Sequence, residues 1–517
     1  MSHGLTTDAP IDRQLLHDLA AGDGAVHVIG AASAEGVAVT RLLTSLGIVV
    51  VLHDMRERGA IRKAFRTTHG AYSLAQQDAI WAEIAPILDS GCTGDSYLTG
   101  IEDAAAVSLG QGWYLDQENR ERIAHSVPSG VPILSMTGLY FALSAAPIAG
   151  ITGTNGKSTT VALVDALLEG GGVSHRTAGN ERSMPQVLPE IESLTKDDWL
   201  VLEVSNRQLL QLSRSPRIAA ITALTPDHLE EHGGIDGYVA AKRRLFAAQG
   251  ASDIAIANAS DALALEVARS SSGLVIQCGV GSFDGPAVTW IDDTLVATDV
   301  PVVGGPALSG RTELAHMSDL TLPGRHNQIN AAVAVATALS CGTPPASIAA
   351  SLAGFSGKSL RLEQLDSVND IEIWSDIKST TPEATVAALQ ALDSRSLHLI
   401  IGGTDKGLNY SGLARTIVEQ RVAVLAVPGS ATDALEQELH SADPHHTWLE
   451  RVDSLETALD EALGNASAGD AIIVSPAAAG FWTTQLQGKP SLRALVRRRR
   501  ESDITRTSER ATTHPGS

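Results

Sequence analysis

The segment of this 517-residue sequence with the clearest chemical capacity is a glycine-rich turn followed by a lysine and two hydroxyl side chains. It lies between residues 147–152, an apolar run typical of a strand, and residues 158–168, an amphipathic run typical of a helix. Glycines let backbone N–H groups converge on phosphate oxygens, a helix N-terminus adds positive charge, and a lysine reaches terminal phosphates. The pattern predicts a nucleotide-phosphate site made of Gly153, Thr154, Asn155, Gly156, Lys157, Ser158 and Thr159.

Two further polar residues follow apolar runs of the kind that form buried strands. Glu203 ends the run 199–203, and His228 follows the run 218–224. Either side chain alone is equally consistent with an ordinary polar residue at a strand end. Carboxylate and imidazole groups at the ends of neighbouring strands are also suited to hold a metal ion beside a triphosphate. Together with the Ser158 hydroxyl, they predict a magnesium site beside the turn.

Short apolar runs separated by potential helices recur along the chain, which predicts an α/β fold with parallel sheets. A length of 517 residues suggests about three domains at roughly 150 residues each. We expect a dinucleotide-type N-terminal domain at residues 1–146, a central parallel-sheet ATP-binding domain at 147–345, and a dinucleotide-type C-terminal domain at 346–496. Residues 497–517 begin with four arginines, lack apolar periodicity and are expected to form a disordered tail.

The first block resembles half of a dinucleotide-binding fold. It has a strand at 26–30, a turn at 30–36, a helix, and a second strand at 48–52 followed by Asp54. The turn is one residue longer than the dinucleotide fingerprint and lacks its middle glycine. A tight strand-to-helix turn without a ligand explains it equally well, so the turn alone assigns no ligand.

Charge and composition exclude several classes of partner. The chain has 59 acidic and 38 basic residues and a formal charge of -21, which repels nucleic-acid backbones and anionic membranes. No apolar run reaches the ~18 residues that a membrane-spanning helix needs, and the N-terminus does not have the pattern of a secretory signal. The three cysteines have neither metal-ligand spacing nor the even count of a disulfide framework. We therefore expect a cytoplasmic protein without nucleic-acid or membrane partners.

Beyond the glycine-rich turn, further blocks occur in the order found in the Mur ligases of peptidoglycan precursor synthesis. The chain resembles this family from about residue 26 to residue 480. The blocks lie at residues 178–180, 202–209, 225–229, 238–242, 324–331, 361–363, 376–380 and 402–407. The serine after the lysine, Ser158, is most similar to the D-glutamate-adding branch. The resemblance implies a three-domain plan, ATP and Mg²⁺ as cofactors, and ligation through an acyl phosphate.

The resemblance also implies roles for individual residues. Glu203 and His228 would ligate magnesium, and Lys242, which otherwise reads as a surface cation of a helix, matches the family's carbamylated lysine. The catalytic set would be Lys157, Glu203, His228 and Lys242. ATP would be bound, beside the glycine-rich turn, by Asn327, Asn330, Arg361 and Asp376. The substrates would be bound by Asp54, Arg56, Asn180, Ser205, Lys378, Thr380, Lys406 and Phe481.

Several positions depart from the family pattern. Residues 206–207, Asn-Arg, replace the usual serine and aromatic residue, and residues 135–138 lack the acidic residues expected before the central domain. Residues 66–100 resemble an insertion. Near the C-terminus, Gly480 and Trp482 stand where serine and aspartate are usual. These last two departures fall in the block that is expected to hold the incoming amino acid.

The resemblance therefore implies a ligase that joins glutamate, expected to be D-glutamate, to UDP-N-acetylmuramoyl-L-alanine, and we expect a monomer. A paralogous Mur-type ligase that adds L-glutamate or another amino acid is the first alternative, because the C-terminal block is altered. A nucleotide-binding partner subunit that no longer catalyses ligation is the second alternative. The presence of Lys157, Glu203, His228 and Lys242 argues against it.

Overall fold

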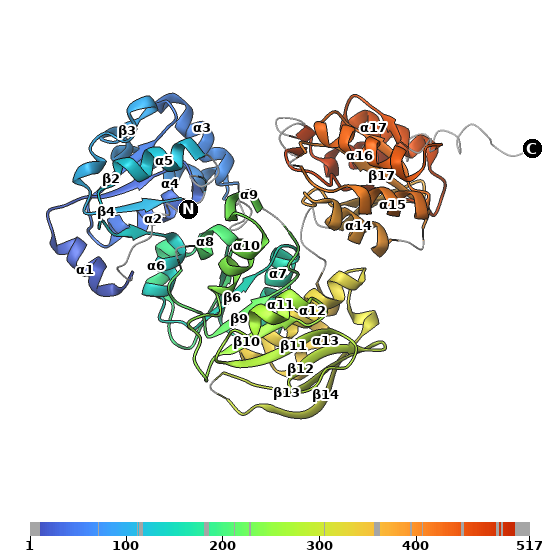
Figure 1. Ribbon diagram of the computed structural model, residues 1–517, viewed down its shortest axis with the longest axis horizontal. Coiled ribbons are helices and arrows are strands. Elements are labelled where there is room, and N and C mark those ends of the chain that lie inside the picture. Colours follow the sequence, from blue (N-terminus) through green and yellow to red (C-terminus); the bar gives the residue numbers. More distant parts are fainter. Residues whose placement is uncertain are drawn as a thin grey trace, which may run out of the picture. The chain divides into compact units, whose positions relative to one another are not determined.

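The computed structural model describes residues 11–70, 72–110, 112, 117–179, 186–210, 212–226, 229–303, 305–355, 362–392, 395–405, 407–445, 449–481, 485–486 and 490–501. The chain forms two compact units, Met1–Asp319 with Ile329–Leu352, and Leu320–Gln328 with Ala353–Ser517. The described residues form three sheets, of which two belong to the first unit and one to the second (Figure 1).

The N-terminal part of the first unit is built on a five-stranded parallel sheet with strand order β3-β2-β1-β4-β5. This is the strand order of dinucleotide-binding folds, as predicted. The strands are β1 (Val26–Ile29), β2 (Val50–Asp54), β3 (Cys92–Thr93), β4 (Ala106–Leu109) and β5 (Ile133–Leu134). The helices are α1 (Arg13–Ala21), α2 (Ala34–Ser45), α3 (Arg58–Thr68), α4 (Leu74–Asp89), α5 (Gln117–Ser126) and α6 (Met136–Leu143), with short 3-10 helices η1 (Gly94–Ser96) and η2 (Ile101–Asp103).

The described residues of the segment 66–100, which resembles an insertion, contribute to this sheet architecture. Helix α4 begins with a capping box at Ser73 and buries Ile80, Ile84 and Leu88 in the core. The chain then enters β3, which pairs in parallel with β2. Because parallel neighbours need a crossover connection, α3 and α4 are the elements that make this pairing possible.

The central part of the first unit is a nine-stranded sheet with order β14-β13-β12-β11-β10-β9-β6-β8-β7. Pairing is parallel from β7 through β12 and antiparallel between β12, β13 and β14. The strands are β6 (Ile148–Thr152), β7 (His175–Ala178), β8 (Trp199–Glu203), β9 (Ile218–Ile221), β10 (Ile254–Asn258), β11 (Leu274–Val280), β12 (Ala287–Ile291), β13 (Thr294–Val300) and β14 (Leu308–His316). The helices are α7 (Lys157–Gly170), η4 (Leu188–Ser193), α8 (Asn206–Leu209), α9 (Leu229–His232), α10 (Ile235–Arg243), α11 (Ala262–Ala268), η5 (Met317–Asp319), α12 (Arg325–Ser340), η6 (Pro345–Ser347) and α13 (Ile348–Ala353).

The second unit contains a six-stranded sheet with order β15-β16-β20-β17-β18-β19, in which only the β15–β16 pair is antiparallel among the described strands. The strands are β15 (Glu363–Val368), β16 (Ile371–Ser375), β17 (Leu397–Ile401), β18 (Ala423–Ala426), β19 (Leu449–Arg451) and β20 (Ala471–Val474). The helices are α14 (Pro382–Ala391), α15 (Ser411–Gln420), α16 (Ser430–Ala442) and α17 (Leu455–Asn465). Their alternation with parallel strands agrees with the predicted α/β class.

The predicted disordered tail needs a correction at its start. Residues 492–501 are helical, so the first five residues of the segment 497–517 continue a helix. Arg499 pairs with Asp460 at 2.6 Å, and Arg500 pairs with Asp366 at 2.5 Å. The arginine run therefore contacts acidic side chains of its own unit. Residues 502–517 lie outside the described residues.

Within the part of the chain that the structure describes, no helix combines the length and the apolar content needed to cross a membrane.

Two tyrosines of the N-terminal part hold a segment of the central part. The hydroxyl of Tyr140, on α6, accepts hydrogen bonds from the backbone N–H groups of Val187 at 3.1 Å and Leu188 at 3.0 Å. The hydroxyl of Tyr72 accepts one from the N–H of Gln186 at 2.9 Å. Burial raises the pKa of the Tyr140 phenol, which therefore stays protonated near neutral pH. The start of η4 is thus anchored to the N-terminal part through buried polar contacts.

The substitution Tyr140→Phe removes the acceptor of two buried N–H groups while it preserves the ring. Because an unsatisfied buried donor costs ~1–3 kcal/mol, we expect the free energy of unfolding to fall by about 2 kcal/mol or more. The matched control Tyr72→Phe affects one donor and should cost about half as much. Chemical denaturation followed by circular dichroism measures both. Equal stability of the Tyr140→Phe variant and the parent protein would contradict this anchoring role.

Candidate nucleotide and metal site

The predicted glycine-rich turn forms the connection between β6 and α7. Gly153 has φ +148° and Gly156, which precedes α7, has φ +86°. A Cβ at Gly153 would lie 2.0 Å from the Thr222 hydroxyl oxygen, and one at Gly156 would lie 2.3 Å from Oδ1 of Asn330. Only glycine fits this combination of backbone conformation and close approach. We call residues 153–159 the phosphate loop.

Hydrogen bonds from the segment after β9 hold the phosphate loop in place. The N–H of Thr154 donates to the carbonyl of Ala223 at 2.6 Å, and its hydroxyl donates to the carbonyl of Thr225 at 2.8 Å. The hydroxyl of Thr222 donates to the carbonyl of Asn155 at 2.5 Å. The loop is therefore fixed on the side of β9 before any ligand binds, which limits the ordering cost of binding phosphate.

Lys157 and Ser158 occupy the first turn of α7. The Lys157 ammonium donates to the carbonyls of Gly153 at 2.9 Å and Thr154 at 2.7 Å, so its charge lies directly on the loop. Ser158 is buried in the same turn. A cation and a helix N-terminus at one place provide the charge that stabilises bound phosphate oxygens.

Lys242, on α10, is fully buried, which its position in a helical sequence did not indicate. Its ammonium donates to the hydroxyl of Thr152 at 3.1 Å and to the carbonyl of Gly153 at 2.9 Å. It also lies 5.2 Å from the ring centroid of Tyr238, whose hydroxyl is 3.0 Å from that of Thr154. A buried cation is costly unless oxygens and a ring face compensate it, and these contacts do so. Tyr238 is a part of the site that the sequence pattern did not single out.

Glu203 lies at the end of β8, opposite Ile151 of β6 in the sheet register. Its side chain is buried, and its Oε2 atom has no hydrogen-bond partner among the described residues. A buried carboxylate oxygen without a donor is a natural ligand for a cation. The residues present therefore fit a divalent metal held by Glu203 and Ser158. His228, the third predicted ligand, lies outside the described residues, which contain no cluster of three or more His, Cys, Asp and Glu side chains.

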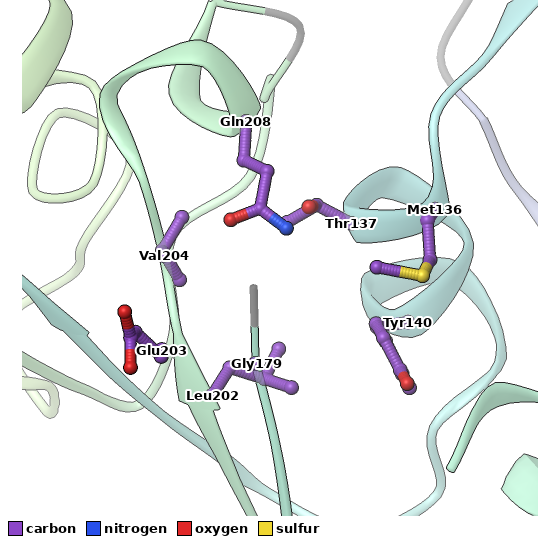
Figure 2. A pocket seen from close by; sticks show the side chains of 8 residues that line it. All are labelled: Met136, Thr137, Tyr140, Gly179, Leu202, Glu203, Val204 and Gln208. Atoms are coloured by element: carbon purple, nitrogen blue, oxygen red, sulfur yellow. The ribbon is translucent and has the colours of Figure 1, made fainter. Parts of the chain in front are cut away.

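A small pocket adjoins Glu203. It is lined by Met136, Thr137, Tyr140, Gly179, Leu202, Glu203, Val204 and Gln208. Figure 2 shows Glu203 and Val204 on one wall, with Met136 and Tyr140 of α6 on the other. Ser205, a predicted substrate residue, and Gln208, which was not predicted, form a capping box at the start of α8. The capping box holds both side chains in place. The predicted substrate residue Asn180 follows Gly179 but lies outside the described residues.

Two of the residues predicted to bind ATP, Asn327 and Asn330, lie on α12. Asn330 contributes the side chain that limits residue 156 to glycine, so it lies against the phosphate loop. Asn327, one turn earlier, is buried and its amide donates to the carbonyl of Pro323 at 2.7 Å. Burial lowers the pKa of His326, the residue before Asn327, to about 4, so this imidazole is neutral at physiological pH.

In the second unit, Asp376 follows β16 and is buried. One carboxylate oxygen accepts from the hydroxyl of Ser475 at 2.7 Å and the other from the N–H of Leu362 at 3.1 Å. These contacts join the ends of β16 and β20 and the start of β15. The role of Asp376 in binding ATP stays a prediction. Lys378 is half-buried and Thr380 is exposed nearby in the chain. Arg361, which was predicted to bind ATP, and Lys406, which was predicted to bind the amino acid, lie outside the described residues.

Of the two altered positions in the C-terminal block, Gly480 is described by the structure and Trp482 lies outside the described residues. Gly480 has φ +77°, and a Cβ there would lie 3.1 Å from the hydroxyl oxygen of Thr404. The N–H of Thr404 donates to the carbonyl of Ala479 at 2.7 Å, which ties the two loops together. Phe481 packs in the hydrophobic core, so its ring serves the packing of this unit. Glycine is therefore suited to this turn, where serine would need a left-handed conformation.

In the N-terminal part, Asp54 ends β2 with a fully buried carboxylate. It accepts from the N–H of Ala32 at 3.2 Å and pairs with the Arg56 guanidinium at 3.0 Å. A Cβ at Gly36 would lie 2.3 Å from the carbonyl oxygen of Gly30, so the turn into α2 is tightly closed. Arg56 is about half exposed, at 47% of its side-chain surface, and is the member of the pair that a substrate can reach.

These features define a parallel α/β nucleotide-binding enzyme with a phosphate loop next to a buried carboxylate. Comparison with known proteins gives the family. Residues 151–338 match the Mur ligase middle domain, and residues 360–478 match the Mur ligase, glutamate ligase domain. The UDP-N-acetylmuramoylalanine--D-glutamate ligase of Pelotomaculum thermopropionicum is 31% identical over 458 residues, which cover 88% of this chain and 93% of the relative. That of Koribacter versatilis is 29% identical over 459 residues, 86% of this chain and 91% of the relative.

Solved structures share the fold. MurF from Acinetobacter baumannii aligns with a TM-score of 0.57 at 16% identity, over 92% of this chain and 98% of that chain. The UDP-N-acetylmuramate-alanine ligase of Thermotoga maritima aligns with a TM-score of 0.53 at 17% identity, over 93% of this chain and 100% of that chain. The chain belongs to the Mur ligase family. Members are ATP-dependent ligases that form amide bonds, and this protein is an enzyme of that class.

The close approach at Gly156 predicts that Gly156→Ala lowers the affinity for ADP by at least about tenfold, or ~1.4 kcal/mol. The added methyl group must displace Asn330 and strain the backbone that carries Lys157. Gly172→Ala is the matched control, because Gly172 also has positive φ but has open space around its Cβ position. Isothermal titration calorimetry on folded protein measures both affinities. An unchanged affinity in Gly156→Ala would contradict the assigned loop.

Proposed function

We propose that this protein joins D-glutamate to UDP-N-acetylmuramoyl-L-alanine at the expense of ATP, as a cytoplasmic, monomeric enzyme of peptidoglycan precursor synthesis. The observation that carries the proposal is the similarity to ligases of that name along 88% of the chain. The phosphate loop with Lys157 and Ser158 supports the use of ATP. The orphaned Oε2 of Glu203 supports the use of Mg²⁺.

The first chemical step activates a carboxylate, which is by itself a poor electrophile. An oxygen of the alanine carboxylate attacks the γ-phosphorus of ATP and releases ADP, so the oxygen becomes the bridge of an acyl phosphate. Lys157 and the loop N–H groups stabilise charge on the transferred phosphoryl group. Mg²⁺, when bound by Ser158, Glu203 and His228, would supply further positive charge at the phosphate oxygens. Lys242 holds the loop through the Gly153 carbonyl as an ammonium, and the carbamylation that we propose would convert this cation into a carbamate.

The second step forms the amide. The amine of glutamate attacks the acyl carbon, and inorganic phosphate leaves with the bridging oxygen. Lys406 and Thr380 are proposed to hold the side-chain carboxylate of glutamate, and Lys378 lies in the same block as Thr380. Orientation of the amine converts a bimolecular attack into an effectively unimolecular one.

A ligase with a different amino-acid preference is the second candidate, because of Gly480. A serine hydroxyl could donate a hydrogen bond to a bound carboxylate, whereas Gly480 has no side chain and lies in a left-handed conformation. The pocket must therefore hold its amino acid through other groups. A subunit that does not catalyse ligation is disfavoured by the intact loop, Glu203 and Lys242.

The direct experiment supplies UDP-N-acetylmuramoyl-L-alanine, ATP and either enantiomer of glutamate, and follows the product by mass spectrometry. We expect product with D-glutamate and at least about a hundredfold less with L-glutamate, a difference of ~2.7 kcal/mol. Product only with L-glutamate would establish the paralogous activity. Binding of ATP without product from any acceptor or amino acid would support the non-catalytic alternative.

We expect Lys157→Ala to lower the release of phosphate at least about a thousandfold, because the charge on the loop is lost at the transferring phosphoryl group. Lys196→Ala removes an exposed lysine and serves as the control with parent-like turnover. A coupled assay for phosphate release measures both variants. Near-parent turnover in Lys157→Ala would refute the assigned phosphate site.

A further inference from the structure

Two polar contacts join α8 to α9. The Arg207 guanidinium binds the Glu231 carboxylate in a bidentate manner, with Nε 2.8 Å from Oε2 and a second nitrogen on Oε1. Next to it, the amide nitrogen of Asn206 is 2.8 Å from Nε2 of His232. The pair is largely enclosed, since 16% of the Arg207 side chain and 14% of the Glu231 side chain are exposed. We call these four residues the α8–α9 clamp.

The clamp connects segments that bear on the metal site. Helix α8 begins shortly after Glu203, and Ser205 is its N-terminal capping residue. Helix α9 begins at Leu229, the residue after the predicted ligand His228. Asn206 and Arg207 are also the two residues that replace the serine and aromatic residue usual in the family. This chain therefore joins α8 to α9 by a charged, directional contact at these positions.

The clamp continues to the phosphate loop. The His232 ring makes an edge contact with the Tyr238 ring, with centroids 5.4 Å apart. The Tyr238 hydroxyl lies 3.0 Å from the hydroxyl of Thr154, and its ring faces the buried Lys242 ammonium. Contacts therefore run from α8 through α9 and α10 to the loop. A displacement of α9 would be transmitted to Tyr238.

Stability alone is a weak reason for an enclosed ion pair. Removing two charges from water costs about as much as their attraction returns, and hydrophobic replacements are often as stable. A bidentate arginine–carboxylate pair instead fixes a distance and an orientation, because the planar groups must align. At this place, the fixed distance is the one between α8 and α9.

We propose that the α8–α9 clamp is a positioning device for the metal site, with Arg207 and Glu231 setting the separation between the Glu203 segment and the start of α9. The proposal rests on the magnesium site of the proposed function. Arg207 and Glu231 act through the segments that they hold and are positioning residues, not catalytic ones. Contacts that orient metal ligands typically contribute about 10- to 100-fold to metal affinity.

The test is a charge swap read out by metal binding. Arg207→Glu, Glu231→Arg and the double variant are compared with the parent protein in complex with ADP. Mn²⁺ is the probe, and electron paramagnetic resonance measures its dissociation constant. We expect each single variant to weaken Mn²⁺ binding about tenfold and the double variant to restore it to within about threefold. ADP affinity without metal should change by less than about twofold in all variants.

A matched control and a set of neutral replacement variants make the result decisive. Arg41→Glu, Glu83→Arg and their double variant swap a bidentate pair between α2 and α4, with Nε 2.6 Å from Oε2, and should bind Mn²⁺ as the parent does. If a charge reversal prevents folding, the neutral variants Arg207→Gln and Glu231→Gln replace it, with the same expected tenfold effect.

Three outcomes overturn the proposal. The first is parent-like Mn²⁺ binding in folded single variants, and the second is failure of the double variant to restore binding. The third is an equal loss of Mn²⁺ and metal-free ADP affinity, which would indicate a general structural role. Failure of the proposed magnesium site would appear differently, because the parent ADP complex itself would then bind no Mn²⁺.

Discussion

The pairing of β6 with β8 on one side and β9 on the other determines where the chemistry of this enzyme takes place. β6 leads directly into the phosphate loop, β8 ends at Glu203 opposite Ile151, and the residues after β9 bond the loop through Thr222 and Ala223. Because all three strands are parallel, their carboxyl ends lie at one edge of the sheet. The strands that carry the loop, the buried carboxylate and the loop anchors are thus placed by backbone hydrogen bonds, and the Thr222 hydroxyl adds a side-chain bond to the loop.

A concentration of positive charge follows from this arrangement. Lys157 of α7 and Lys242 of α10 both donate to the carbonyl of Gly153. Two cations next to one short segment are unfavourable by themselves, and anionic phosphate and carboxylate ligands reduce that repulsion. The overall charge of -21 does not attract anionic substrates, so local positive charge must bind them.

The strand, the loop and the helix of this site could be predicted from the sequence. The burial and the long-range pairing of its charged side chains could not. The strand–turn–helix pattern predicted β6, the loop and α7, because glycine spacing and apolar periodicity are local signals. The predicted strand 218–224 ends instead at Ile221, since Thr222 and Ala223 turn to bond the loop. The burial of Lys242 and the pairing of Arg207 with Glu231 depend on packing between elements distant in sequence. Likewise, the helix at residues 499 and 500 could not be predicted from local sequence, because the acidic side chains that pair with these two arginines lie far away along the chain.

Transfer of the γ-phosphoryl group to a carboxylate is the reaction that we propose for these features, and isotope labelling tests it most directly. UDP-N-acetylmuramoyl-L-alanine labelled with ¹⁸O in both oxygens of the alanine carboxylate is converted with ATP and glutamate, and the released phosphate is analysed by mass spectrometry. An acyl phosphate predicts that each phosphate carries one ¹⁸O atom, because the bridging oxygen leaves with phosphorus. Product formation with unlabelled phosphate would contradict carboxylate phosphorylation at this site.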